Sequence, residues 1–114
     1  MKIRVYRSKE FKEWFDSLCD REQRNVLSRI DRYEENGVLI QFKPLDNRHH
    51  LFEFKWKSGL RVYFTLQVDL DGNFTLLLKG GNKNSQEHDI SESKRIILAA
   101  MISIHRKKNI GERK

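Results

Sequence analysis

The sequence predicts a small α+β domain whose elements follow the order β-αα-βββ-α, with an antiparallel sheet packed on a helix hairpin. Two observations carry this prediction. In the first third of the chain, apolar residues recur at intervals of three and four, as in a helix packed on one side. Beyond Pro44 they alternate with polar residues, as in a strand with one buried face. The 114 residues suffice for one domain, which we place at residues 1–104, followed by a basic tail at 105–114.

The N-terminal third is expected to form a strand and a helix hairpin. Residues 1–6 alternate in polarity, which predicts the strand. Ser8 is expected to cap the first helix and Asp20 the second, and Gly37 after Asn36 is a stop signal. Cys19, between the helices, is expected to be a small buried residue. The apolar positions are Phe11, Trp14, Phe15 and Leu18 in the first helix and Leu27, Ile30 and Tyr33 in the second.

The middle of the chain is expected to form three strands joined by tight turns. Ser58-Gly59 and Asp71-Gly72 are turn sequences, and Gly80-Gly81 is expected to end the third strand. Because such short connections cannot cross over the sheet, neighbouring strands must be antiparallel. A last helix is expected to start near Asp89 or Ser91 and to run to about residue 104.

One face of this sheet is expected to pack on the helix hairpin and the other to remain open. The residues whose phase places them on the open face are Arg4, Glu53, Lys55, Arg61, Tyr63 and Lys79. The chain carries a net charge of +7, and this face is mostly basic with an aromatic ring among the cations. Such a surface suits a phosphate-bearing chain with bases to stack. An ordinary solvated face is the alternative.

Several classes of protein are excluded or disfavoured. Cys19 is the only cysteine, so an intramolecular disulfide cannot form. The longest apolar run, residues 96–102, is far shorter than a membrane span, and the N-terminus has no signal-peptide core. We therefore expect a cytoplasmic protein that does not contact the membrane. The four histidines lack zinc-site spacing, so we expect no metal or other cofactor.

A resemblance to a known family emerges when motifs are considered together. In order along the chain they are Phe42-Lys43-Pro44-Leu45, Glu53-Phe54-Lys55, Leu60-Arg61-Val62-Tyr63-Phe64 and Leu77-Leu78-Lys79-Gly80-Gly81-Asn82-Lys83-Asn84-Ser85-Gln86. Together they resemble the RelE/ParE toxin superfamily, specifically its HigB-like branch of addiction module killer proteins. The similarity runs from about Phe11 to Lys94. Leu60, Asn82 and Lys55 depart from it, since the family pattern usually has Tyr, Asp and Arg there.

The resemblance implies the toxin of a type II toxin–antitoxin system. Such a toxin is a metal-independent endoribonuclease that cleaves mRNA, usually on the ribosome, and is neutralised by a cognate antitoxin, often a helix-turn-helix protein. The superfamily also contains ParE-like toxins, which are not nucleases and poison DNA gyrase by protein binding. That second activity is the alternative for this chain. The implied fold agrees with the order of elements expected above.

The chemistry of RNA cleavage suggests roles for the polar residues. Arg61 is expected to stabilise the reacting phosphate, and Lys83 to contact it or protonate the leaving oxygen, both at one phosphate site. If Gly80-Gly81 only ends a strand, Lys83 lies in solvent instead. The remaining candidates are Lys55 and Lys79 for flanking phosphates, Tyr63 for base stacking or packing, Gln86 for a base edge or loop contact, and His88 and Glu53 for proton transfer, with surface and ion-pair roles as their alternatives.

Overall fold

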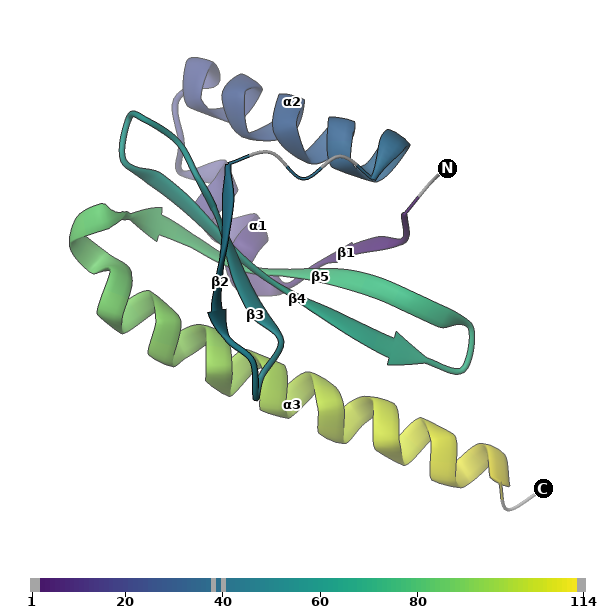
Figure 1. The fold of residues 1–114 in the computed structure, drawn as a ribbon. Coiled ribbons are helices and arrows are strands. Elements are labelled where there is room, and N and C mark those ends of the chain that lie inside the picture. Colours follow the sequence, from purple (N-terminus) through teal and green to yellow (C-terminus); the bar gives the residue numbers. More distant parts are fainter. Residues whose placement is uncertain (1–2, 38, 40, 113–114) are drawn as a thin grey trace.

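The computed structural model describes the backbone of residues 3–37, 39 and 41–112 and the side chains up to Ser103 (Figure 1). The predicted order of elements is confirmed, with one strand more than expected, β2. The elements are β1 (Val5–Arg7), α1 (Lys9–Asp16), α2 (Asp20–Asn36), β2 (Phe42–Asp46), β3 (Leu51–Lys55), β4 (Leu60–Asp69), β5 (Gly72–Asn82), a 3₁₀ turn (Lys83–Ser85) and α3 (Gln86–Glu112).

The five strands form one sheet in the order β1-β5-β4-β3-β2. The consecutive strands from β2 to β5 are antiparallel, as the short turns require. The expectation of a wholly antiparallel sheet is wrong for β1, which pairs parallel to β5 with Val5 opposite Thr75. No hairpin joins these two strands, so their direction is free of that constraint. Pro44 lies in the edge strand β2, where a residue without an N–H is tolerated.

Local signals fix the helix ends. The Ser8 side chain accepts a hydrogen bond from the N–H of Phe11 at 2.9 Å, which confirms it as the cap of α1. Gly37 ends α2 in the left-handed conformation (φ 70°), also as predicted. The prediction for Asp20 is wrong, because Cys19 takes the cap position and makes no side-chain capping bond. Cys19 is exposed, contrary to expectation, since a cap lies outside the packed helix face.

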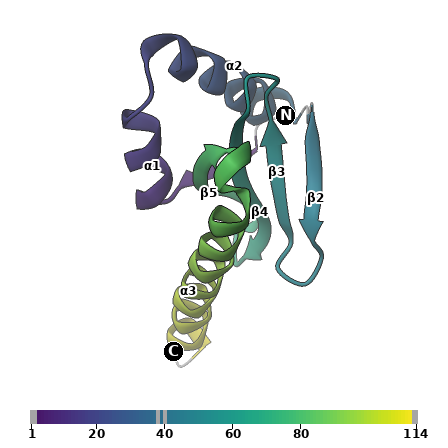
Figure 2. The ribbon, with the colours of Figure 1, turned by 90° about the vertical axis from the view of Figure 1, so that its left-hand side faces the viewer.

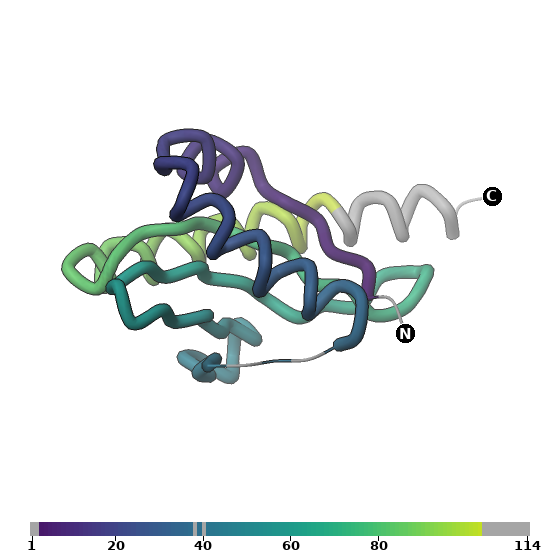
Figure 3. The backbone as a smooth tube through the Cα atoms, turned by 90° about the horizontal axis from the view of Figure 1, so that it is seen from above, coloured from purple at the N-terminus to yellow at the C-terminus, as the bar shows by residue number. Residues whose placement is uncertain are grey.

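Helices α1 and α2 cover one face of the sheet with an aromatic core. Figure 3 shows α2 running across the strands. The buried residues of α2 are Val26, Ile30 and Tyr33, so the stripe is shifted from the predicted Leu27, which is only half-buried. On the sheet, Phe64 stacks on Phe54 with ring centroids 4.5 Å apart. The hairpin-facing side of the sheet is thus closed, as predicted.

The opposite face is not open, because α3 packs on it. Figures 1 and 2 show this helix on the side of the sheet away from α2. A second buried cluster joins Ile97 of α3 to Leu51, Tyr63 and Leu78 of the sheet. The helix begins at Gln86 and ends at Glu112, so it is longer than expected at both ends. Its length explains the coverage, since a helix this long must bury part of its apolar surface.

Candidate nucleic-acid interface

Arg61 lies at one end of the sheet, in a shallow hollow that α3 leaves uncovered. It is paired across the strands with Lys55 of β3 and Gly81 of β5. The guanidinium Nη1 donates to the carbonyl oxygens of Leu60 at 2.9 Å and Trp56 at 3.3 Å. The hollow measures about 410 Å³, and its lining residues are Gln41, Phe42, Lys55, Trp56, Lys57 and Arg61. It brings three cations together beside two aromatic rings, with no acidic group in its lining.

Gly80 and Gly81, near the end of β5, permit close packing rather than a turn. The strand continues through them to Asn82, which corrects the expectation that it ends at Gly80-Gly81. A Cβ on Gly80 would lie 2.0 Å from the Trp14 ring of α1, and a Cβ on Gly81 would lie 1.9 Å from Asp89 Oδ2 of α3. Helices therefore approach the strand closely from both sides, because neither glycine has a side chain.

Lys79 is already paired within the protein. Its ammonium lies 3.7 Å from the carboxylate of Asp89, which is 3% exposed. Asp89 also accepts a hydrogen bond from Ser85 Oγ at 2.5 Å. These contacts attach the first turns of α3 to β5. Lys79 acts here as an anchor for the helix, beside rather than inside the Arg61 hollow.

Tyr63 and Glu53 are buried beneath α3, and Glu53 contacts the half-buried Gln86 at the start of that helix. Tyr63 is completely buried, so its ring offers no face to a base and the packing alternative holds. Burial, followed by the nearby charges of Glu53 and Asp89, raises the pKa of the Tyr63 phenol, and the phenol stays neutral. Glu53 is 1% exposed and accepts both its bonds from Gln86 Nε2, at 3.0 and 3.2 Å. Gln86 therefore fixes α3 to β3.

Lys83 lies next to the β3–β4 turn but in a different hollow from Arg61. Its backbone N–H donates to the Gly59 carbonyl at 2.9 Å, and its side chain lies over Gly59. The hollow measures about 490 Å³ and is lined by residues 83–88, among them the exposed His88. Asn82 accepts from the N–H groups of Asn84 and Ser85 and so caps this segment. The turn of the chain separates the Lys83 hollow from the Arg61 hollow.

Arg4 belongs to another part of the sheet. It forms an ion pair with Asp69 at 2.8 Å and donates to the Gly72 carbonyl, at the far end of the β4–β5 hairpin. The hydrogen bonds that this guanidinium donates to Asp69 raise its pKa above its ordinary value. The predicted basic face therefore divides into an exposed cluster around Arg61, a paired Lys79 and a distant Arg4.

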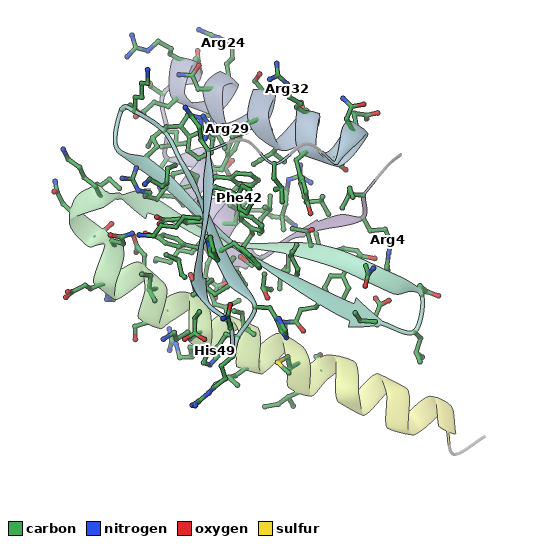
Figure 4. All side chains as sticks on the ribbon, viewed as in Figure 1. Arg4, Arg24, Arg29, Arg32, Phe42 and His49 are labelled. Atoms are coloured by element: carbon green, nitrogen blue, oxygen red, sulfur yellow. The ribbon has the colours of Figure 1, made fainter. Side chains whose placement is uncertain are left out.

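The sequence analysis missed Arg29, which contributes a cation from α2. Its guanidinium lies 4.1 Å from the centre of the Trp56 ring and donates to the Lys55 carbonyl and, at 2.7 Å, to Gln41 Oε1. Burial lowers its pKa. Figure 4 shows Arg29 near the sheet, with Arg24 before it and Arg32 after it on the same helix. One arginine among many charges on a helix carries no signal in sequence; only the fold places it beside Trp56.

The architecture places the protein in a known structural class. Its mixed α+β sheet and helices match the fold of RelE toxins. A doubly substituted form of the Escherichia coli toxin RelE, solved in the free state, superposes with a TM-score of 0.63 at 15% sequence identity, covering 84% of this chain and 99% of that one. The chain thus has the RelE fold.

Two further solved structures are more distant. A RelBE toxin–antitoxin complex from Mycobacterium tuberculosis gives a TM-score of 0.49 at 14% identity, covering 72% of this chain and 99% of that one. An archaeal RelE–RelB complex from Pyrococcus horikoshii gives 0.42 at 18% identity, covering 73% and 97%. No protein-family model and no curated protein matches the sequence. In the part of the chain that the structure describes, no helix has the length and apolarity to cross a membrane.

Proposed function

We propose that the protein is the toxin of a type II toxin–antitoxin system, in the HigB-like branch, and that it acts as a metal-independent endoribonuclease on mRNA, on the ribosome in the cytoplasm. The observation that supports this proposal is the Arg61 hollow. Lys55, Lys57 and Arg61 line it together with two aromatic rings, and no acid lines it. Phosphates and bases are the groups that such a lining attracts. The RelE fold agrees with this activity.

The proposed reaction uses the substrate's own 2′-hydroxyl. Its oxygen forms a bond to the adjacent phosphorus, and the bond from phosphorus to the 5′-oxygen of the next nucleotide breaks. Negative charge builds up on the phosphoryl oxygens, where a guanidinium stabilises it through paired hydrogen bonds. Within the described residues the Nη1 group of Arg61 is bonded and its Nε is buried, which leaves the two N–H groups of Nη2 for a phosphate. Lys55 and Lys57 then hold the neighbouring phosphates.

The two proton transfers are assigned to exposed groups. Lys83 and His88 line the hollow on the other side of the β3–β4 turn, and both are exposed. An imidazole has one nitrogen that can accept a proton and one that can donate a proton, so His88 suits both transfers. Glu53 is buried and held by Gln86, so we assign it a positioning role: it orients Gln86 and with it the start of α3.

The proposed partners are mRNA, the ribosome and a cognate antitoxin, a helix-turn-helix protein. Poisoning of DNA gyrase, as by ParE-like toxins, is the alternative function. A gyrase poison binds a protein surface and has no need of clustered cations that take phosphates. The acid-free lining of the Arg61 hollow therefore favours RNA.

The test is expression without an antitoxin. We expect growth arrest and new mRNA 5′ ends within translated codons. Arg61→Ala should lower the cleavage rate about 10²–10³-fold, the cost of losing one group that stabilises transition-state charge. Arg95→Ala, which removes an exposed arginine paired with Glu92 on α3, is the matched control and should remain active. Growth arrest with DNA breaks and intact messages would assign gyrase as the target, and full cleavage by folded Arg61→Ala would exclude Arg61 from the site.

A further inference from the structure

We infer that a second RNA-binding hollow lies between α2 and the β3–β4 turn, and that it takes the phosphodiester chain leading away from the Arg61 hollow. This inference rests on the proposed ribonuclease function and extends its site. The second hollow measures about 350 Å³, and its lining residues are Asn25, Ser28, Arg29, Arg32, Gln41 and Trp56. Gln41 and Trp56 line the Arg61 hollow as well, so the two depressions adjoin.

All the charged side chains that line the two hollows are positive. The cations that line one or the other are Arg29, Arg32, Lys55, Lys57 and Arg61, and no Asp or Glu lines either. Elsewhere in the described residues, Lys79 and Arg4 each lie against a carboxylate. A strip that holds five cations and excludes acids fits a polyanion.

Arg29 gives the strip a fixed cation. Its guanidinium stacks on Trp56 and bonds only to neutral oxygens, those of Lys55 and Gln41, among the residues that the structure describes. Arg29 is half-buried, so its charge is partly withdrawn from water, and among the described residues it has no opposite charge beside it. A bound phosphate would supply that missing charge at the junction of the two hollows.

The junction is also held in a costly backbone conformation. Gln41 has a positive φ of 51°, which is uncommon for a residue with a side chain. Its carbonyl accepts from the Lys55 N–H at 2.9 Å, and its side chain accepts from Arg29. Gln41 thereby ties α2 to the end of β3. Such conformations persist where surrounding contacts enforce them, and they cluster at binding sites.

The other lining groups favour single-stranded RNA over an acidic peptide. Phe42 is 40% exposed at the rim and offers a ring to a base. Asn25, Ser28 and Gln41 offer neutral donors and acceptors of the kind that read base edges. The phosphodiester chain can come from the same strand that is cut or from ribosomal RNA, since the recognised group is identical.

The first experiment measures binding of 2′-O-methyl RNA, which has no free 2′-hydroxyl and cannot be cut by the proposed reaction. Fluorescence anisotropy with oligonucleotides of increasing length compares the wild type with Arg32→Gln and with Arg24→Gln. Arg32 is exposed in the second hollow, whereas Arg24 is exposed on the same helix and lines neither hollow, which makes it the matched control. We expect Arg32→Gln to weaken binding of long oligonucleotides three- to tenfold and to reduce the salt slope by about 0.7, the value for one phosphate contact on a single strand.

The pattern of losses identifies the source of the RNA. A loss that appears only for long oligonucleotides assigns the second hollow to the substrate strand. A loss of ribosome binding in a pelleting assay, with oligonucleotide binding intact, assigns it to ribosomal RNA. If Arg32→Gln matches Arg24→Gln in both assays, or if it impairs only neutralisation by the antitoxin, the inference is overturned.

The same variants separate this inference from the proposed function. Binding of an uncleavable oligonucleotide does not depend on catalysis. If the wild type binds with the expected length dependence but cuts no message in cells, the second hollow stands and the ribonuclease proposal fails. If messages are cut while Arg32→Gln binds long RNA as tightly as the wild type, the ribonuclease proposal stands and the second hollow fails.

Discussion

The two faces of the sheet are held by different kinds of contact. Helices α1 and α2 pack on one face through aromatic rings: Tyr33 of α2 lies tilted against Phe64, which in turn stacks on Phe54 within the sheet. Helix α3 has a smaller apolar cluster on the other face, around Tyr63 and Ile97. Its remaining contacts are polar: Lys79 to Asp89, Gln86 to Glu53, and Lys94 to Asp46.

Because of this difference, salt and pH should affect the stability of the packing on the two faces to different extents. Burial of apolar surface involves no charges, so charge screening and moderate changes of pH affect it little. Ion pairs weaken in salt and are lost when the acid is protonated. The hairpin side therefore secures the fold. The α3 side positions the charged residues near the Arg61 hollow and depends on solution conditions. The following predictions test this contrast, from the largest expected effect to the smallest.

The largest effect is expected from Phe64→Ala on the hairpin side. Phe64 is fully buried between Phe54 and Phe52, with ring centroids at 4.5 and 5.5 Å. Removing the ring leaves a cavity and should lower the free energy of unfolding by about 3–5 kcal/mol. Urea denaturation measures the loss, which should be the same at low and high salt. Phe42→Ala, at an exposed rim position, is the control and should cost far less.

Asp89→Asn should have a smaller effect, and one that depends on salt. The change removes the charge opposite Lys79 while leaving an amide that can still accept from Ser85. A partly buried ammonium without its carboxylate should cost about 1–3 kcal/mol. The double variant Lys79→Met/Asp89→Asn should recover part of this loss. If the cost of Asp89→Asn is the same in 0.05 M and 1 M NaCl, the α3 side is not held electrostatically there.

Cys19→Ser should stabilise the hairpin side slightly. Cys19 occupies the cap of α2 in an extended conformation, but its side chain makes no capping bond to the backbone. A serine hydroxyl accepts from the second or third N–H of a helix, and a good cap is worth about 0.5–1 kcal/mol. Thermal unfolding should show a small rise in Tm. An unchanged or lower Tm would mean that the contact between Cys19 Sγ and Glu22 outweighs the cap.

The hairpin side was largely predictable from the sequence and the α3 side was not. Alternation placed Phe54 and Phe64 on one face and Arg61 and Tyr63 on the other, and the strand pairing confirms both phases. Burial of Tyr63 could not follow from alternation, because it depends on a helix packed from outside the sheet. The close packing at Gly80 and Gly81 also depends on helices packed from outside the sheet, so the sequence could not show it. Because glycine is common in turns, the pair was interpreted as the end of the strand.

The candidate site likewise has a part that the sequence predicted and a part that it did not. Arg61 and Lys55 were predicted to share one face of the sheet, and the structure shows that they are also cross-strand partners. The placement of Lys83 in a hollow separate from that of Arg61 depends on the turn after β5, and the placement of Arg29 on Trp56 depends on how α2 crosses the sheet. Such long-range geometry leaves no periodic trace in the sequence.

The smallest effect on stability is expected from the ion pair between Asp46, at the end of β2, and Lys94 of α3, which we call the clasp. Asp46 accepts hydrogen bonds from Lys94 Nζ at 3.1 Å and from the backbone of Arg48 and His49, and the His49 ring lies 3.3 Å away. Figure 4 shows His49 beside α3. The contact with Lys94, followed by that with His49, lowers the pKa of Asp46 well below its usual range. A depressed carboxyl pKa stabilises the fold above the unfolded pKa of about 4 and loses that contribution as the pH falls toward the folded value.

Asp46→Asn should therefore be slightly less stable than the wild type at pH 7, and the gap should close as the pH is lowered below about 4. Denaturant melts at a series of pH values measure the gap between the two proteins. Hydrogen exchange should locate the change in α3 around Lys94 and leave α2 as protected as before, because the aromatic side has no part in the clasp. Asp16→Asn, at the exposed C-terminal end of α1, is the control and should show no such gap. A gap that stays constant from pH 7 to pH 2, or a loss of protection spread equally over α2 and α3, would show that the two faces do not differ in this way.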